Sequence, residues 1–79
     1  MKLKVKTVAF DIPDSGCEME DGRYVLEVEP PFTAQDLIDR FGFSDDTTMV
    51  VNVNGNAVDN DRELQETDYI MMMRAMYGG

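Results

Sequence analysis

Residues 33–43 contain the clearest structural signal in the chain, because they combine the start, the apolar stripe and the stop of a single α-helix. Thr33 is a favourable N-cap, and Asp36 stands at the third helical position, where an acid can complete a capping box. Gly42 can adopt the left-handed conformation that ends a helix. Apolar residues recur three or four positions apart and so share one helix face: Ala34, Leu37, Ile38 and Phe41. We therefore expect one amphipathic helix that packs on the core.

Strand signals lie on both sides of this helix. Residues 2–6 and 23–29 alternate polar and apolar side chains with a period of two, as half-buried strands do, and should pair as a hairpin. Residues 48–53 are β-branched and apolar enough to form a central strand, and residues 69–73 should form the last strand. Residues 11–22 are acidic and rich in Pro, Gly, Asp and Ser, which predicts a long connection.

Asn54 and Gly55 are the strongest short hairpin signal in the chain, since a type I′ turn needs residues that tolerate positive φ. The chain should return from this turn through a short strand at residues 56–58. Residues 59–64 resemble the acidic half of a calcium loop but lack its central glycine and distal glutamate. We interpret them as a solvated turn that Leu64 anchors inward.

The expected order of elements is strand, strand, helix, strand, short strand, strand. A chain of 79 residues makes one domain with a small core. If the first and last strands lie side by side, the helix lies in their crossover connection, which suits the right-handed rule. We predict an α+β, ubiquitin-like β-grasp fold, with a mixed sheet of four to five strands packed on one main helix. The domain should span residues 1–75, followed by a flexible tail of residues 76–79.

The charge is strongly asymmetric along the chain. Sixteen acidic and seven basic residues give a net charge of −9 at pH 7. Three of the basic residues are Lys2, Lys4 and Lys6, which leaves four basic and sixteen acidic residues between positions 7 and 79. This balance argues against nucleic acid as a partner and favours a positively charged protein surface or a solubilising acidic coat. No apolar run is long enough to span a bilayer and no signal peptide is evident, so we expect a cytoplasmic protein without a membrane partner.

The residue types needed for metal binding and catalysis are scarce. The chain has no histidine and a single cysteine, Cys17, so it has neither a disulfide framework nor a Cys/His metal site. Cys17 is either an incidental loop cysteine or a reactive thiol, and no neighbouring base or cation that would lower its pKa is evident. Because no set of base and nucleophile is evident either, a stand-alone enzyme is the least favoured class.

The sequence ends in two glycines, Gly78 and Gly79. A terminal carboxylate on a stem without side chains can enter a narrow channel in a partner, which makes it a chemical handle. The plain alternative is a chain cut at a flexible glycine.

The C-terminal half resembles the ThiS/MoaD sulfur-carrier family. The resemblance rests on residues 51–58, on the pair Gly78 and Gly79, and on the residues between them, Asp61, Leu64, Asp68 and Ile70. The short distance from Val58 to Leu64 is more similar to the MoaD type, the small subunit of molybdopterin synthase, than to the thiamine carrier.

This resemblance implies a mechanism in which the chain is a carried substrate. A ubiquitin-activating-type enzyme would use ATP to adenylate the Gly79 carboxylate, and a sulfurtransferase or other donor would convert the adenylate to a thiocarboxylate. The acceptor would be a synthase large subunit or a thiazole synthase. Gly78 would let the tail enter partner sites, and Tyr77 and Met76 would be recognised behind it. No bound cofactor is implied.

Two other functions remain open. The first is a ubiquitin-like modifier joined to protein lysines through Gly79, and the second is a β-grasp interaction domain without terminal chemistry. Four methionines, at positions 71, 72, 73 and 76, could form an adaptable docking surface, or they could be core residues with a tolerated outward neighbour.

Overall fold

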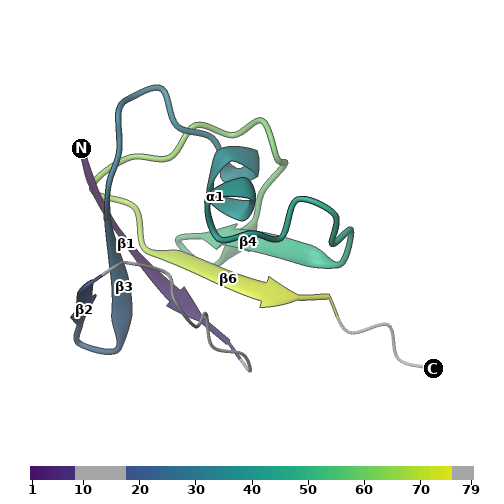
Figure 1. Cartoon of the computed structure of the whole chain (residues 1–79), viewed down its shortest axis with the longest axis horizontal. Helices are drawn as coiled ribbons and strands as arrows, with labels where there is room; N and C mark the ends of the chain where they lie inside the picture. The colour runs from purple at the N-terminus through teal and green to yellow at the C-terminus, as the bar shows by residue number, and fades with distance from the viewer. Residues whose placement is uncertain (9–17, 76–79) are drawn as a thin grey trace.

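A computed structural model describes residues 1–8 and 18–75 of the chain. Within these residues one helix lies against a single sheet of six strands, in the order β2-β3-β1-β6-β4-β5 (Figure 1). The elements are β1 (Lys2–Thr7), β2 (Glu18–Glu20), β3 (Arg23–Glu27), α1 (Ala34–Arg40), β4 (Met49–Val53), β5 (Asn56–Ala57) and β6 (Ile70–Arg74). One helix on a mixed sheet is the predicted α+β, β-grasp fold.

The first and last strands lie side by side in the middle of the sheet. β1 pairs in parallel with β6, from Val5 opposite Ile70 to Thr7 opposite Met72, and it pairs antiparallel with β3 on its other side. β4 is antiparallel to β6. Because parallel neighbours need a crossover connection, the chain passes through α1 between these strands. The predicted adjacency of the first and last strands is confirmed.

The core lies between α1 and the sheet face that it covers. Every second residue through β4 is buried, and β1 and β6 alternate in the same way, as the pleat of a strand requires. The side chains that are fully buried and largest are Leu3, Leu26, Leu37, Leu64, Ile70, Met72, Val5 and Val51. All residues that are buried as a whole among those described are apolar, so the core contains no polar or charged residue.

Both ends of α1 are built as the sequence predicts. The Thr33 hydroxyl accepts a hydrogen bond from the Asp36 amide at 3.1 Å, and the Thr33 amide donates to the Asp36 carboxylate at 2.9 Å, which completes the capping box. At the other end Phe43 donates its amide to the Ile38 carbonyl at 3.0 Å, beyond a Gly42 with φ of +85°. This is a Schellman end, and it turns Phe43 back onto the core.

The prediction of four to five strands is wrong, because β2 forms inside the stretch expected to be a long connection. Asp21 and Gly22, with φ of +52° and +76°, make a two-residue turn that pairs Glu20 with Arg23. All three residues of β2 are exposed at the sheet edge, and three residues are too few for a period of two to be recognised. The Asp-Gly turn is the signal that could have revealed this strand, and residues 11–17 of the expected connection lie outside the described residues.

The predicted hairpin at Asn54 and Gly55 is confirmed. Both residues have positive φ, +54° and +90°, and the turn pairs Val53 with Asn56. β6 begins at Ile70, one residue later than expected, because the Tyr69 amide donates to the Asn54 side chain.

Replacement of the N-cap tests how much the capping box stabilises the fold. We expect Thr33→Ala to lower the free energy of unfolding by about 1 kcal/mol, because the Asp36 amide loses its acceptor. Urea denaturation measures this loss. Thr47→Ala is the matched control, since Thr47 is exposed in a turn, and its effect should stay within about 0.5 kcal/mol. Equal losses in the two variants would contradict a stabilising cap.

Candidate functional site

The residues predicted to react or to be recognised lie outside the described residues, and so does Cys17. The predicted site residues are Met76, Tyr77, Gly78 and Gly79. The structure describes β6, the strand that leads to them, together with the contacts that hold it. The candidate site is therefore built from the two ends of β6 and the sheet face around it.

β6 is held along both of its edges. Ile70 and Met72 are completely buried beneath α1. The Val8 amide donates to the Met72 carbonyl at 3.0 Å, which extends the pairing past the end of β1. On the other edge the Ala75 amide, one position after β6, donates at 2.7 Å to the carbonyl of Thr48, one position before β4. The backbone is thus held by its neighbours as far as Ala75.

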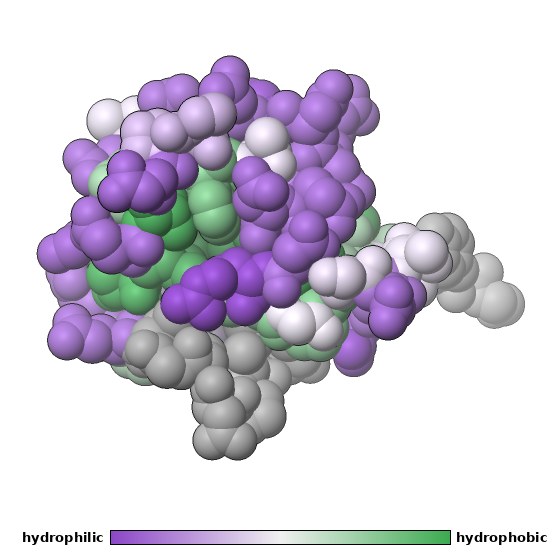
Figure 2. All heavy atoms as spheres, turned by 45° about the horizontal axis from the view of Figure 1, so that its top comes forward, coloured by the Kyte–Doolittle hydropathy of each residue, from purple (hydrophilic) through white to green (hydrophobic). Residues whose placement is uncertain are grey.

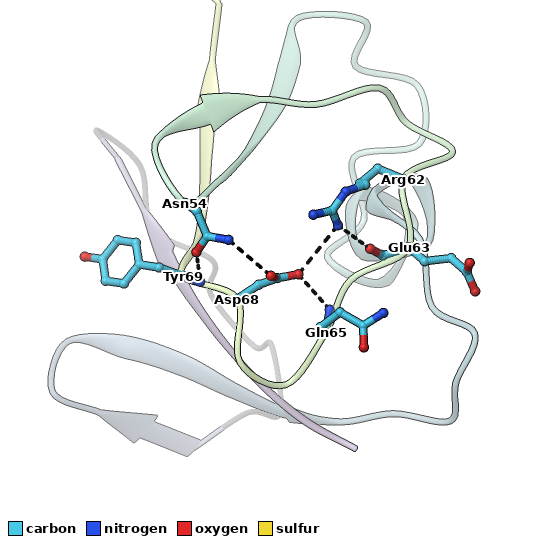
Figure 3. Close-up of polar contacts among 6 residues, drawn as sticks. All are labelled: Asn54, Arg62, Glu63, Gln65, Asp68 and Tyr69. Atoms are coloured by element: carbon cyan, nitrogen blue, oxygen red, sulfur yellow. Dashed lines mark hydrogen bonds and ion pairs between the residues drawn. The ribbon is translucent and has the colours of Figure 1, made fainter.

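A polar network centred on Asp68 holds the start of β6 (Figure 3). Its carboxylate accepts hydrogen bonds from the Asn54 side-chain amide at 3.2 Å and from the Gln65 backbone amide at 2.8 Å. The Arg62 guanidinium lies 3.6 Å from the same carboxylate. Only 8% of the Asp68 side chain is exposed, so these donors replace most of its water.

Asn54 joins this network to the β4–β5 turn. Its side-chain oxygen accepts from the Tyr69 backbone amide at 2.9 Å (Figure 3). The Asn54 backbone amide donates to the Tyr69 carbonyl at 2.8 Å. Leu64 between the two turns is buried, as predicted. Asn54, Leu64 and Asp68, which were singled out by the resemblance, therefore act together to fix the approach to β6.

The end of β6 is held by a second set of contacts. The Arg74 Nε donates to the Asp46 Oδ2 at 3.1 Å, and the guanidinium carbon lies 5.7 Å from the centre of the Phe43 ring. The other oxygen of Asp46 accepts from the Thr48 amide at 2.9 Å and from the Thr48 hydroxyl. The Asp46 carboxylate therefore binds both Thr48, the residue just before β4, and Arg74, the last residue of β6. The sequence offered no pattern for this contact, because its partners are 28 residues apart.

These contacts lower the pKa of Asp46. The hydrogen bond from the Thr48 hydroxyl is the largest cause, followed by the Thr48 backbone amide, with Arg74 contributing less. All three favour the charged carboxylate over the neutral acid.

The sheet face opposite α1 divides into a charged and an apolar region. Lys2, Lys4 and Lys6 lie on the outward face of β1, and Arg23 and Glu27 lie beside them on β3. The Lys4 ammonium is 2.9 Å from the Glu20 carboxylate, and this hydrogen bond lowers the pKa of Glu20. The basic residues near the N-terminus are thus partly neutralised by acids on neighbouring strands.

A groove of about 610 Å³ lies along this charged region. Its lining contains basic and acidic side chains together with Tyr69, over whose ring the Arg23 guanidinium lies at 5.6 Å. The Lys2 backbone amide donates to the Glu66 carboxylate at 2.6 Å beside it. Basic and acidic side chains therefore lie together along the groove. Figure 2 shows the molecule with the top of Figure 1 turned forward, where hydrophilic residues cover most of the face in view and hydrophobic atoms are exposed between them.

The methionine run divides between the two sheet faces. Met72 is fully buried, whereas Met71 and Met73 are half-buried on the outward face. The Asn52 side-chain amide approaches the Met73 sulfur at 3.6 Å. The described residues contain no group of three or more His, Cys, Asp or Glu side chains that could hold a metal ion, and this applies to residues 59–63 as well.

The parallel pair of β1 and β6, covered by a single helix, defines the class of this protein as ubiquitin-like β-grasp. Two solved structures share the fold. A protein from Pyrococcus furiosus named as molybdopterin converting factor, subunit 1, superposes with a TM-score of 0.68 at 21% identity, covering 95% of this chain and 98% of its own. SAMP1 from Haloferax volcanii gives a TM-score of 0.66 at 18% identity, covering 100% of both chains. At these identities the likeness concerns the fold.

The model of the ThiS family matches residues 17–79, and the chain belongs to this family of ubiquitin-like sulfur carriers. The comparison with curated proteins gives no significant match. Among residues 1–8 and 18–75 there is no helix with the length and apolar character needed to cross a bilayer.

The Asp68 network gives a stability prediction. We expect Asp68→Ala to lower the free energy of unfolding by about 1–3 kcal/mol, because the Asn54 side chain and the Gln65 amide lose a buried acceptor. Chemical denaturation of both proteins measures the difference. Asp61→Ala removes the same charge from an exposed position nearby and should have a much smaller effect. A similar loss in both variants would mean that net charge, not the network, is responsible.

The lowered pKa of Asp46 gives a pH prediction. The unfolded chain binds this proton at a higher pH than the folded chain, so Asp46 stabilises the fold above about pH 4. This contribution disappears as the pH falls through the lowered folded-state pKa. The difference in unfolding free energy between the wild type and Asp46→Asn should therefore shrink between pH 7 and pH 3, as measured by denaturation at each pH. A difference that stays constant over this range would refute the assignment.

Proposed function

We propose that this chain is a sulfur carrier whose reacting group is the Gly79 carboxylate. A carboxylate oxygen attacks the α-phosphorus of ATP on a partner enzyme, and pyrophosphate leaves to give the acyl adenylate. A donor that delivers sulfur at the oxidation level of sulfide then attacks the acyl carbon, and AMP leaves. The product is a thiocarboxylate, and ATP is a substrate of the partner enzyme, not a resident cofactor of this chain.

The family match is the observation that supports this proposal most strongly. It extends to residue 79, so the matched region includes Gly78 and Gly79. The described fold is consistent with a carried substrate, because its core is filled by apolar side chains. Without side chains at the glycine pair, the carboxylate can enter a narrow partner site.

We further propose that the acceptor is of the molybdopterin-synthase type, with a thiazole synthase as the next candidate. The P. furiosus protein that shares the fold is named as a molybdopterin converting factor subunit. In this scheme the chain is the small subunit of the synthase, and Tyr77 and Met76 contact the large subunit and the adenylating enzyme. Apolar side chains beside a reacting terminus provide binding energy that the glycines lack.

A second candidate function is a ubiquitin-like modifier linked to protein lysines through Gly79. The ubiquitin-like fold favours it, because the same carboxylate and the same adenylate would serve both reactions. Lysine-linked conjugates of higher mass in the producing cells would distinguish this function from sulfur transfer.

Intact mass spectrometry tests the carrier function. After incubation with the cognate adenylating enzyme, ATP and sulfide, replacement of oxygen by sulfur should add about 16 Da. Oxidation of any of the seven methionines adds almost the same mass, so the mass alone is insufficient. We therefore expect the Cys17→Ser variant to gain one site for a thiol-alkylating reagent only when ATP is present.

A chain without Gly79 is the control for this experiment and should gain no alkylation site. The proposal would be refuted if the adenylating enzyme is active on another carrier protein but leaves the Cys17→Ser chain without an alkylation site.

A further inference from the structure

Arg74 occupies a particular place in the chain, because it is the last residue of β6 and is separated from the glycine pair by three residues. Its side chain is held on two sides. Asp46 accepts from its Nε at 3.1 Å, and the Phe43 ring lies 5.7 Å from its guanidinium carbon. We call Phe43, Asp46 and Arg74 the exit clamp.

The exit clamp is anchored to the rest of the domain through Phe43 and Asp46. Phe43 packs on the core, and its amide donates to the Ile38 carbonyl at the end of α1. The Asp46 amide in turn donates to the Phe43 carbonyl at 2.9 Å. The clamp therefore connects the end of the helix to the end of β6.

The exit clamp also holds the last described backbone contact of β6. Asp46 accepts two hydrogen bonds from Thr48, and the Thr48 carbonyl accepts the Ala75 amide at 2.7 Å. A terminal strand pair frays unless contacts beyond the ladder hold it. Asp46 supplies such a contact to both strands of the pair, through Thr48 on one and Arg74 on the other.

This anchoring limits how far the terminal carboxylate can travel. Four residues follow Ala75, and even a fully extended chain of this length spans at most about 14 Å. If the contact between Ala75 and Thr48 opens and β6 is held only as far as Met73, six residues follow the last held position. The limit then rises to about 21 Å. The effective concentration of a tethered group falls as its tether lengthens.

We propose that Arg74, held by Asp46 and Phe43, is a positioning residue that fixes the point from which the reacting C-terminal segment starts. The inference rests on the proposed function, because it concerns delivery of the Gly79 carboxylate to the adenylating enzyme. Opening the exit clamp leaves the docking surface of the domain intact and reduces the fraction of docked complexes in which the carboxylate reaches ATP.

The test measures ATP–pyrophosphate exchange by the adenylating enzyme of the same organism, with Arg74→Ala, Asp46→Asn and the double variant as substrates. We expect kcat to fall about three- to tenfold in each, with little change in KM. Because both substitutions open the same contact, the double variant should be no worse than the poorer single variant. Arg74→Lys should restore part of the rate, since it keeps the charge opposite Asp46 but not the planar group on Phe43.

Arg40→Ala is the matched control, because it removes an exposed positive charge from the last turn of α1, and it should react like the wild type. Direct recognition of Arg74 by the enzyme predicts a different pattern, in which Asp46→Asn is silent or the two losses add. Either result overturns the positioning role.

Amide hydrogen exchange, followed by NMR on the free chain, gives a readout that needs no enzyme. The Ala75 amide should exchange faster in Arg74→Ala and Asp46→Asn than in the wild type, whereas the Leu37 amide in α1 should not change. Unchanged exchange at Ala75 overturns the exit clamp itself. A wild-type chain that supports no pyrophosphate exchange defeats the proposed function, whereas active wild type with equally active variants defeats only the positioning role.

Discussion

The parallel pairing of β1 with β6 is the constraint on which the rest of this structure depends. It brings the first and last strands into the middle of the sheet and requires α1 to lie in the crossover between them. The apolar face of α1 then closes over Val5, Ile70 and Met72, which supply the centre of the core. β6 has a neighbouring strand on each edge, β1 and β4, so the residues after it follow a strand whose backbone is paired on both sides.

Sequence patterns predicted those parts of the fold in which the physical cause is local. The capping box of Thr33, the Gly42 helix end and the Asn54–Gly55 turn depend on residues within a few positions of one another, and all three are confirmed. β2 escaped prediction because it has only three residues, all exposed at the sheet edge, which are too few to establish a period of two. The Asp46–Arg74 contact escaped for another reason, since tertiary pairing brings its partners together and neither residue is unusual in its own segment.

The candidate site divides in the same way. The glycine pair that we propose as the reacting end was evident from the sequence and lies outside the described residues, whereas the contacts that hold β6 became evident only from the fold. Asp68 and Asn54 fix the start of the strand, and Asp46 with Thr48 fixes its end. The polar groups that matter for positioning thus lie at the ends of β6, and an apolar core holds the strand between them.

The two edges of the sheet have a consequence for encounters between copies of the chain. β2 and β5 are three and two residues long, and β2 presents Glu18 and Glu20. Short edges with charged side chains leave few free backbone groups with which a second copy could extend the sheet. Growth of the sheet from chain to chain through these two described edges is therefore disfavoured.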